Sequence, residues 1–199
     1  MTQQPTLRTS RLILRPFQDT DAPAVQRLAS AREVALNTLT VPHPYPDGAA
    51  EAWIVAQRDE FENGMLHNFA AAAGEELIGS IGLMMKGERI AEIGYWIGVP
   101  YWGRGYASEA AAELIRHGFE DLGLERIYAG YYARNEASGR VLQKLGMVYE
   151  GTMRRHVCKW GEYLDVVCYG LLRDEWLSSA TRSTASPAGA GEERKSAGL

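Results

Sequence analysis

The chain has 199 residues, of which 46% are hydrophobic, and its formal net charge is −4. This length suits a single domain with a sizeable core, and the acidic balance argues against nonspecific binding to nucleic acid. Because no apolar run reaches the roughly 18 residues of a membrane span and the polar N-terminus lacks a signal-peptide core, the sequence predicts a cytoplasmic protein without a membrane partner.

The first half of the chain alternates between extended and helical patterns. In chain order we expect a strand at 7–14, a helix at 22–30, an extended loop at 41–46, a helix at 48–63, and strands at 68–73, 77–85 and 89–99. Capping residues at Asp19–Asp21 start the first helix, and Asn63-Gly64 ends the second. Short turns separate the last three strands, which therefore form an antiparallel meander.

A glycine-bearing turn joins the last of these strands to a helix expected over 108–120. Gly103 and Gly105 permit backbone torsions that other residues resist, so the chain can approach a ligand closely there. The free N–H groups and the dipole of the helix start favour an anion, and Arg104 adds a fixed positive charge. Tight packing of an ordinary strand–turn–helix is the competing explanation of the same glycines.

The second half adds a strand at 126–132, a helix at 135–145 and two strands near 147–157 and 163–172. This order predicts an α/β (α+β) fold, a mixed central sheet of about seven strands with helices on both faces. We assign residues 1–177 to the domain. The segment 178–199, rich in Ser, Ala, Gly, Pro and charge, is expected to be a disordered tail.

The turn Trp102-Gly103-Arg104-Gly105-Tyr106-Ala107 resembles the Gln/Arg-x-x-Gly-x-Gly/Ala signature of the GNAT N-acetyltransferase superfamily, with Trp102 in place of the usual first residue. It lacks the glycine spacing of a P-loop and the third glycine of a dinucleotide fingerprint. Within the superfamily the chain is similar to the RimJ/RimL-like group, the ribosomal-protein N-terminal alanine acetyltransferases. That resemblance spans about 7–176 and rests on the segments 7–15, 91–97, 135–138, 144–147, 150–154 and 163–172.

The resemblance implies that acetyl-CoA is the co-substrate. Its pyrophosphate would lie on the backbone amides of the turn, its pantetheine along the long strand, and further contacts would come from the last helix of the domain. The implied residues are Arg104, Gly105, Tyr106 and Ala107 for the pyrophosphate, Ile97 and Val99 for the pantetheine, and Asn135 and Lys144 for the further contacts. Asn135 equally suits a plain helix cap, and Lys144 a solvated surface charge.

Glu92 is the first candidate for the general base, because many GNAT enzymes carry a catalytic glutamate at this position; a salt bridge is the competing role. The resemblance gives Ser138 the role of hydrogen bonding to the sulfur of the leaving thiolate; completing the helix cap is the competing role. The tyrosine that many relatives use as an acid is replaced by Leu142, and a second glutamate position falls near Val157. His156 is therefore a substitute base, with a structural role in its strand as the alternative.

The implied reaction is acetyl transfer to a primary amine. At pH 7 deprotonation costs roughly 1.4 kcal/mol for an α-amine and about 4.6 kcal/mol for a lysine. A site with one weak base therefore favours the N-terminal α-amine of a protein or peptide. A small-molecule acceptor, such as an amino acid or polyamine, is one alternative, and a non-catalytic CoA-binding sensor is another. The two cysteines, Cys158 and Cys168, form no metal-binding pattern, and the oligomeric state, a homodimer included, is left open.

Overall fold

The computed structural model describes residues 3–184 of the chain. Its eight strands form one sheet in the order β1-β2-β3-β4-β5-β6-β8-β7. The strands are β1 (Leu7–Arg8), β2 (Ile13–Arg15), β3 (Leu66–Ala73), β4 (Glu76–Met85), β5 (Ile90–Ile97), β6 (Arg126–Tyr132), β7 (Val148–Lys159) and β8 (Glu162–Leu172). The α-helices are α1 (Ala22–Ala29), α2 (Arg32–Leu36), α3 (Ala49–Glu62), α4 (Tyr106–Glu120), α5 (Glu136–Lys144) and α6 (Arg173–Thr184).

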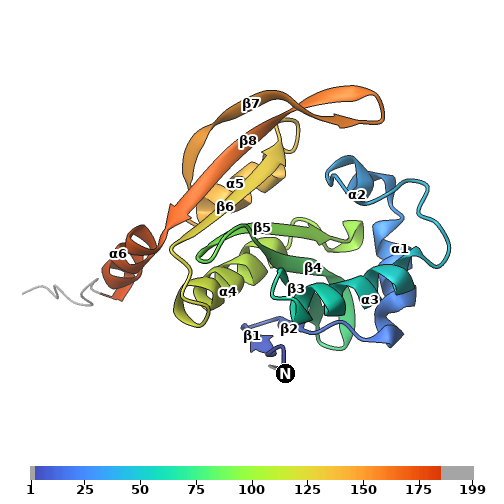
Figure 1. Cartoon of the computed structure of the whole chain (residues 1–199), viewed down its shortest axis with the longest axis horizontal. Helices are drawn as coiled ribbons and strands as arrows, with labels where there is room; N and C mark the ends of the chain where they lie inside the picture. The colour runs from blue at the N-terminus through green and yellow to red at the C-terminus, as the bar shows by residue number, and fades with distance from the viewer. Residues whose placement is uncertain (1–2, 185–199) are drawn as a thin grey trace, which may run out of the picture.

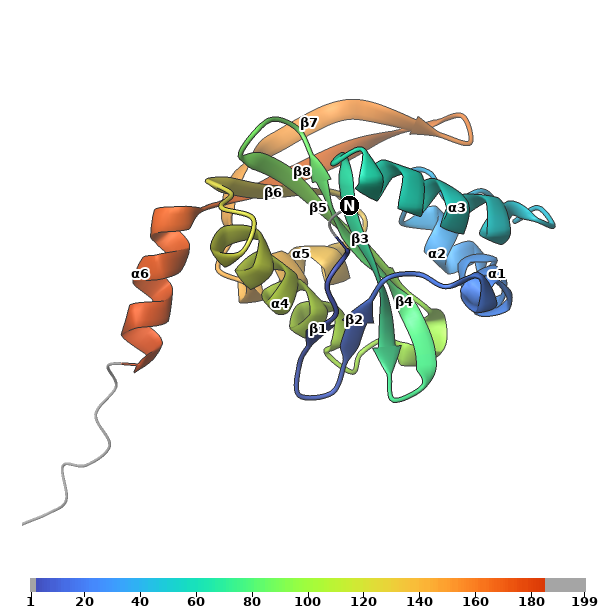
Figure 2. The ribbon, with the colours of Figure 1, turned by 60° about the horizontal axis from the view of Figure 1, so that its bottom comes forward.

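Helices cover both faces of the sheet, as the sequence predicts. Figure 2 shows α4 and α5 on one face and α1, α2 and α3 on the other. Large apolar side chains between the helices and the sheet, such as Phe69 and Ile81 on the strands and Leu114 on α4, are fully buried. Among the described residues no helix is long and apolar enough to cross a membrane.

The structure differs from the sequence prediction in several details. The sheet has eight strands rather than about seven, because 7–14 is a hairpin whose turn is closed by the Leu12 amide donating to Thr9 Oγ1 at 2.8 Å. The short helix α2 was not predicted. Helix α6 continues past the expected domain end at 177 to Thr184, and the Trp176 ring lies 5.5 Å from that of Phe119. The rest of the predicted tail, 185–199, lies outside the described residues.

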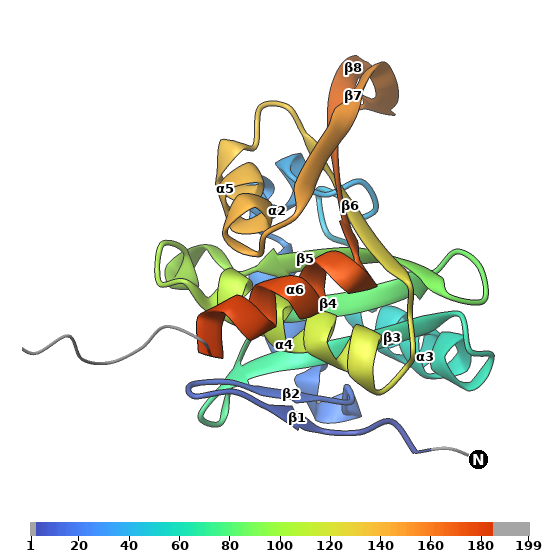
Figure 3. The same ribbon diagram turned by 90° about the vertical axis from the view of Figure 1, so that its left-hand side faces the viewer.

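Strands β5 and β6 diverge, and this divergence creates the space for a site. They pair in parallel only from Ile90↔Arg126 to Glu92↔Tyr128, whereas β5 stays paired with β4, and β6 with β8, to their ends. The sheet thus splits into an arm of β1–β5 and an arm of β6–β8 (Figure 1). Figure 3 shows the second arm standing up from the first.

Every second residue of β5 points its backbone N–H and C=O groups into the split. The Gly98 amide donates to the Ile78 carbonyl of the neighbouring strand at 2.8 Å, so even-numbered residues bond to β4. The N–H and C=O groups of Tyr95 and Ile97 therefore point into the split. Beyond Glu92 no described strand pairs with this edge of β5.

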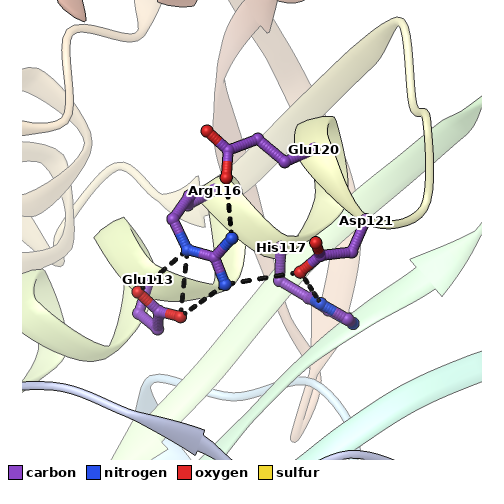
Figure 4. A network of polar contacts seen from close by, with 5 residues as sticks. All are labelled: Glu113, Arg116, His117, Glu120 and Asp121. Carbon is purple, nitrogen blue, oxygen red and sulfur yellow. Dashed lines mark hydrogen bonds and ion pairs between the residues drawn. The ribbon is translucent and has the colours of Figure 1, made fainter.

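Helix α4 is fixed to the sheet by its apolar face. Ala110, Ala111, Leu114 and Phe119 are fully buried. On the outer side, Arg116 bonds to Glu113, Glu120 and Asp121, and Asp121 also contacts His117 Nδ1 at 2.8 Å (Figure 4). Partly exposed ion pairs contribute little to stability, so the position of the helix start depends mainly on the buried face.

Candidate active site

The start of α4 has the geometry of an anion site. Gly103 and Gly105 both have left-handed torsions, with φ of 74° and 79°, and α4 begins at Tyr106, two residues before its predicted start. No described side chain caps the helix, and the first intrahelical bond is from Glu109 N to Gly105 O. The amides of the first turn, including Tyr106 and Ala107, are therefore available to a ligand.

The hairpin between β1 and β2 braces this turn. Arg11 donates through Nη1 to the Arg104 carbonyl at 3.0 Å and through Nε to Glu109 Oε2 at 2.6 Å. Glu109 Oε1 accepts from Thr9 Oγ1 at 2.6 Å and from the Arg11 amide at 2.8 Å. Burial alone would raise the pKa of Glu109, but the hydrogen bonds from Thr9 and Arg11 outweigh it and lower that pKa to about 2. This contact set, which we call the Arg11–Glu109 clasp, was missed by the sequence analysis.

The end of β5 differs from its prediction. The strand stops at Ile97 rather than Val99, and Val99 lies in the 3-10 turn η2 (Val99–Tyr101). Pro100 accounts for this, because it cannot donate to a ladder. The Ile97 carbonyl, which faces the split, accepts from Trp102 Nε1 at 2.6 Å. A carbonyl oxygen has two lone pairs, so one remains for a ligand.

Helix α5 brings Ser138 to the split. Asn135 is the N-cap residue, and its Oδ1 accepts from the Ser138 amide at 3.3 Å, so the capping role is confirmed. Ser138 Oγ lies 2.9 Å from Tyr95 Oη on the opposite arm. Leu142 is buried and supplies no acidic group, and Lys144 is exposed in the last turn of α5.

Glu92 lies on the other face of the sheet from Ser138. Side chains alternate along a strand, so Glu92 points away from the face to which Tyr95 points, about 10 Å away along β5. Its Oε2 is 3.2 Å from Lys86 Nζ, so the predicted salt bridge is present, with the carboxylate side chain 29% exposed. The pKa of Tyr128, its neighbour in register, is raised by burial and by the charge of Glu92.

The tip of the β7–β8 hairpin is tied to the loop between α2 and α3. Lys159 is buried, and its Nζ donates to the carbonyls of Thr38 at 2.9 Å, Leu39 at 3.1 Å and Val41 at 3.0 Å. We call this the Lys159 clamp. Arg134, at the end of the β6 arm, donates to the Leu36 carbonyl at 2.8 Å and strengthens the same connection.

A cavity of about 280 Å³ lies beside this hairpin, lined by Tyr132, Ala133, Arg134, Glu162, Tyr163, Leu164 and Asp165. Asp165 Oδ1 accepts from the amide of Arg155, which has a φ of 50° in a bulge of β7. His156 lies exposed in the same bulge. Among the described residues no group of three or more His, Cys, Asp or Glu is placed to hold a metal ion.

Comparison with known proteins identifies the family. The acetyltransferase (GNAT) domain family matches residues 11–148. The chain belongs to this family. The uncharacterized N-acetyltransferase YoaA of Bacillus subtilis is 31% identical over 186 residues, which cover 85% of this chain and 97% of that protein. Family membership and relatives of this kind indicate an N-acetyltransferase, as the sequence analysis expected.

Solved GNAT structures share the fold. A GNAT acetyltransferase from Bacillus anthracis is 26% identical with a TM-score of 0.78, covering 85% of this chain and 99% of that one. RimL, described as a ribosomal L7/L12 α-N-protein acetyltransferase in complex with coenzyme A, has a TM-score of 0.80 at 19% identity. The match covers 86% of this chain and 99% of the RimL chain. At that identity the likeness to RimL shows the fold alone.

Proposed function

We propose that this GNAT protein transfers the acetyl group of acetyl-CoA to a primary amine, with the N-terminal α-amine of a protein or peptide as first choice. The observation that carries the proposal is the uncapped start of α4 directly beside the unpaired edge of β5. The free amides at the start of α4 suit a pyrophosphate, and the free backbone groups along the edge of β5 suit the amides of a pantetheine.

Acetyl-CoA would lie on the α4–α5 side of the split. Its pyrophosphate would accept from the amides of Arg104, Gly105, Tyr106 and Ala107. The free lone pair of the Ile97 carbonyl would receive a pantetheine amide, and the sulfur would lie beside Ser138. The remaining length of the acetyl-CoA molecule is proposed to contact Val99, Asn135 and Lys144.

The acceptor amine would enter from the opposite face, where Glu92 points. The amine lone pair attacks the thioester carbon, the C–S bond breaks, and CoA leaves as a thiolate that hydrogen-bonds to Ser138. Glu92 takes the proton of the amine, directly or through a water molecule. Lys86 Nζ lies 3.2 Å from Glu92 Oε2, and this ion pair would help to hold the carboxylate on the face from which the amine enters.

The α-amine is favoured because it loses its proton more easily than a lysine side chain at neutral pH. RimL, whose fold this chain shares, is described as an α-N-protein acetyltransferase. A small amine, such as an amino acid or a polyamine, is the second candidate acceptor, because the cavity beside Tyr132 has room for a compact ligand.

Thiol release from acetyl-CoA with a panel of amines tests this proposal. The panel comprises a hexapeptide with an N-terminal alanine, the same peptide with a blocked α-amine and one internal lysine, a free amino acid and spermidine. We expect the fastest release with the free α-amine peptide and little with the blocked one. Micromolar CoA binding without turnover on any amine would favour a sensor instead, and the absence of CoA binding would contradict the proposal.

A further inference from the structure

The hydrogen bond between Tyr95 and Ser138 joins the two arms of the split sheet. Tyr95 belongs to β5 and Ser138 to α5, which packs on β6, and their hydroxyl oxygens are 2.9 Å apart. The ring of Tyr95 packs against the main core. A second tyrosine, Tyr131, packs against α5 from its own arm, because a Cβ at Gly139 would lie only 2.5 Å from Tyr131 Oη. Of these two tyrosines, Tyr95 is the one that hydrogen-bonds to Ser138, at 2.9 Å.

A serine hydroxyl has one hydrogen and two acceptor lone pairs, and its hydrogen rotates to suit its neighbours. Near a helix start the carbonyls of the preceding turn compete for that hydrogen. A phenol that donates to Ser138 Oγ fills one lone pair and leaves the serine hydrogen for another acceptor. Burial raises the pKa of Tyr95 more than the bond to Ser138 lowers it, so the phenol keeps its proton over the neutral range and is able to donate.

We propose that Tyr95 is a positioning residue that donates to Ser138 Oγ and so directs the hydrogen of Ser138 toward the sulfur of CoA. This inference rests on the proposed function, because it needs the thioester to lie beside Ser138. Tyr95 does not itself give up a proton: a phenol is a weaker acid than a thiol, so net transfer to the thiolate would run uphill. Ser138 stabilises the thiolate by a hydrogen bond while the C–S bond breaks, and Tyr95 orients that hydrogen bond.

Tyr95→Phe and Ser138→Ala, singly and together, test the coupling through thiol release with the alanine-leading hexapeptide. Tyr95→Phe removes one hydroxyl and keeps the ring, and we expect kcat to fall by about 5-fold; Ser138→Ala should lower it by about 20-fold. Because Tyr95 acts through Ser138, the double variant should match Ser138→Ala within about twofold. Tyr131→Phe removes a hydroxyl that lies against the same helix and should leave kcat within about twofold.

A binding experiment repeats the test without any acceptor. We expect the wild type to bind CoA about fivefold more tightly than desulfo-CoA, which lacks the sulfur that Ser138 would contact. Either single variant should reduce this difference between the affinities for CoA and desulfo-CoA, and the double variant should reduce it no further. Tyr131→Phe should leave the difference unchanged. The affinity for desulfo-CoA should stay within about twofold throughout, which separates loss of the sulfur contact from damage to the site.

The outcomes distinguish a failure of the positioning role of Tyr95 from a failure of the proposed function. If Tyr95→Phe keeps both kcat and the preference for CoA, or if its effect multiplies with that of Ser138→Ala, the positioning role is wrong while the proposed function stands. If the wild type binds neither CoA nor desulfo-CoA, the proposed function fails and this inference fails with it. If the wild type binds CoA but acetylates no peptide, the binding experiment alone decides the role of Tyr95.

Discussion

The two ends of the proposed site are built in different ways. At the nucleotide end, the ligand would contact backbone amides from four consecutive residues at the start of α4, which a nearby buried helix face and the Arg11–Glu109 clasp hold in place. At the acceptor end, the walls come from a hairpin and a loop that the Lys159 clamp joins across 118 to 121 residues of sequence. The first end depends on local torsions, and the second depends on side chains that meet only in the folded protein.

The largest expected effect concerns the proposed general base, Glu92, which belongs to neither end of the site. Glu92→Gln keeps the shape of the side chain and removes its ability to accept a proton, so we expect turnover to fall by about 100-fold at pH 7. The loss should shrink as pH rises, because more of the amine is then neutral before it binds. A pH–rate profile beside Glu88→Gln, in the neighbouring turn, measures this. Turnover within threefold of wild type at pH 7 would exclude Glu92 as the base and favour His156 or an ordered water.

Breaking the Lys159 clamp should affect the acceptor end alone. Lys159→Met leaves three carbonyls without their donor and releases the α2–α3 loop, so we expect the KM for the peptide to rise by about 10-fold. The Kd for CoA should stay within twofold, because none of these residues approaches α4. Arg58→Met, which removes an exposed cation on α3, is the matched control. An equal loss of CoA affinity would show that the two ends are not independent.

The smallest effect concerns the nucleotide end. Trp102→Phe removes the indole N–H that bonds to the Ile97 carbonyl and keeps an aromatic ring. If that bond competes with the pantetheine, the variant should bind CoA about threefold more tightly, whereas the affinity for ADP, which has adenosine and a pyrophosphate but no pantetheine, should not change. Weaker CoA binding would instead mean that the indole orients the carbonyl for its ligand.

The nucleotide end could be predicted because its information is local. Gly103, Gly105 and the helix-forming run after them specify the turn whatever the rest of the chain does, and the structure has both glycines in left-handed torsions. The antiparallel meander and the N-cap at Asn135 were predicted for the same reason. The order of the remaining elements came from the same local patterns, and it agrees with the resemblance to the GNAT superfamily, which the family match confirms.

The other features could not be predicted because they depend on long-range contacts. Nothing near Lys159 in sequence indicates its three carbonyl partners. Tyr95 has the sequence pattern of an ordinary half-buried strand residue, and its contact with Ser138 forms only because α5 packs beside it in the fold. The prediction of a strand reaching Val99 was wrong by two residues, because Val99 already belongs to the 3-10 turn that contains Pro100. The hairpin at 7–14 was read as one strand because its turn has no glycine or proline and is closed by Thr9.

Calorimetry with CoA on wild type, Gly105→Val and Gly123→Val tests the central claim most directly. Both glycines have left-handed torsions, 79° and 66°, so valine strains the backbone in each variant, but only Gly105 adjoins the proposed pyrophosphate site. We predict that Gly105→Val weakens CoA binding by at least about 100-fold while Gly123→Val stays within about twofold of wild type. Equal affinity in Gly105→Val and wild type would mean that the pyrophosphate binds elsewhere.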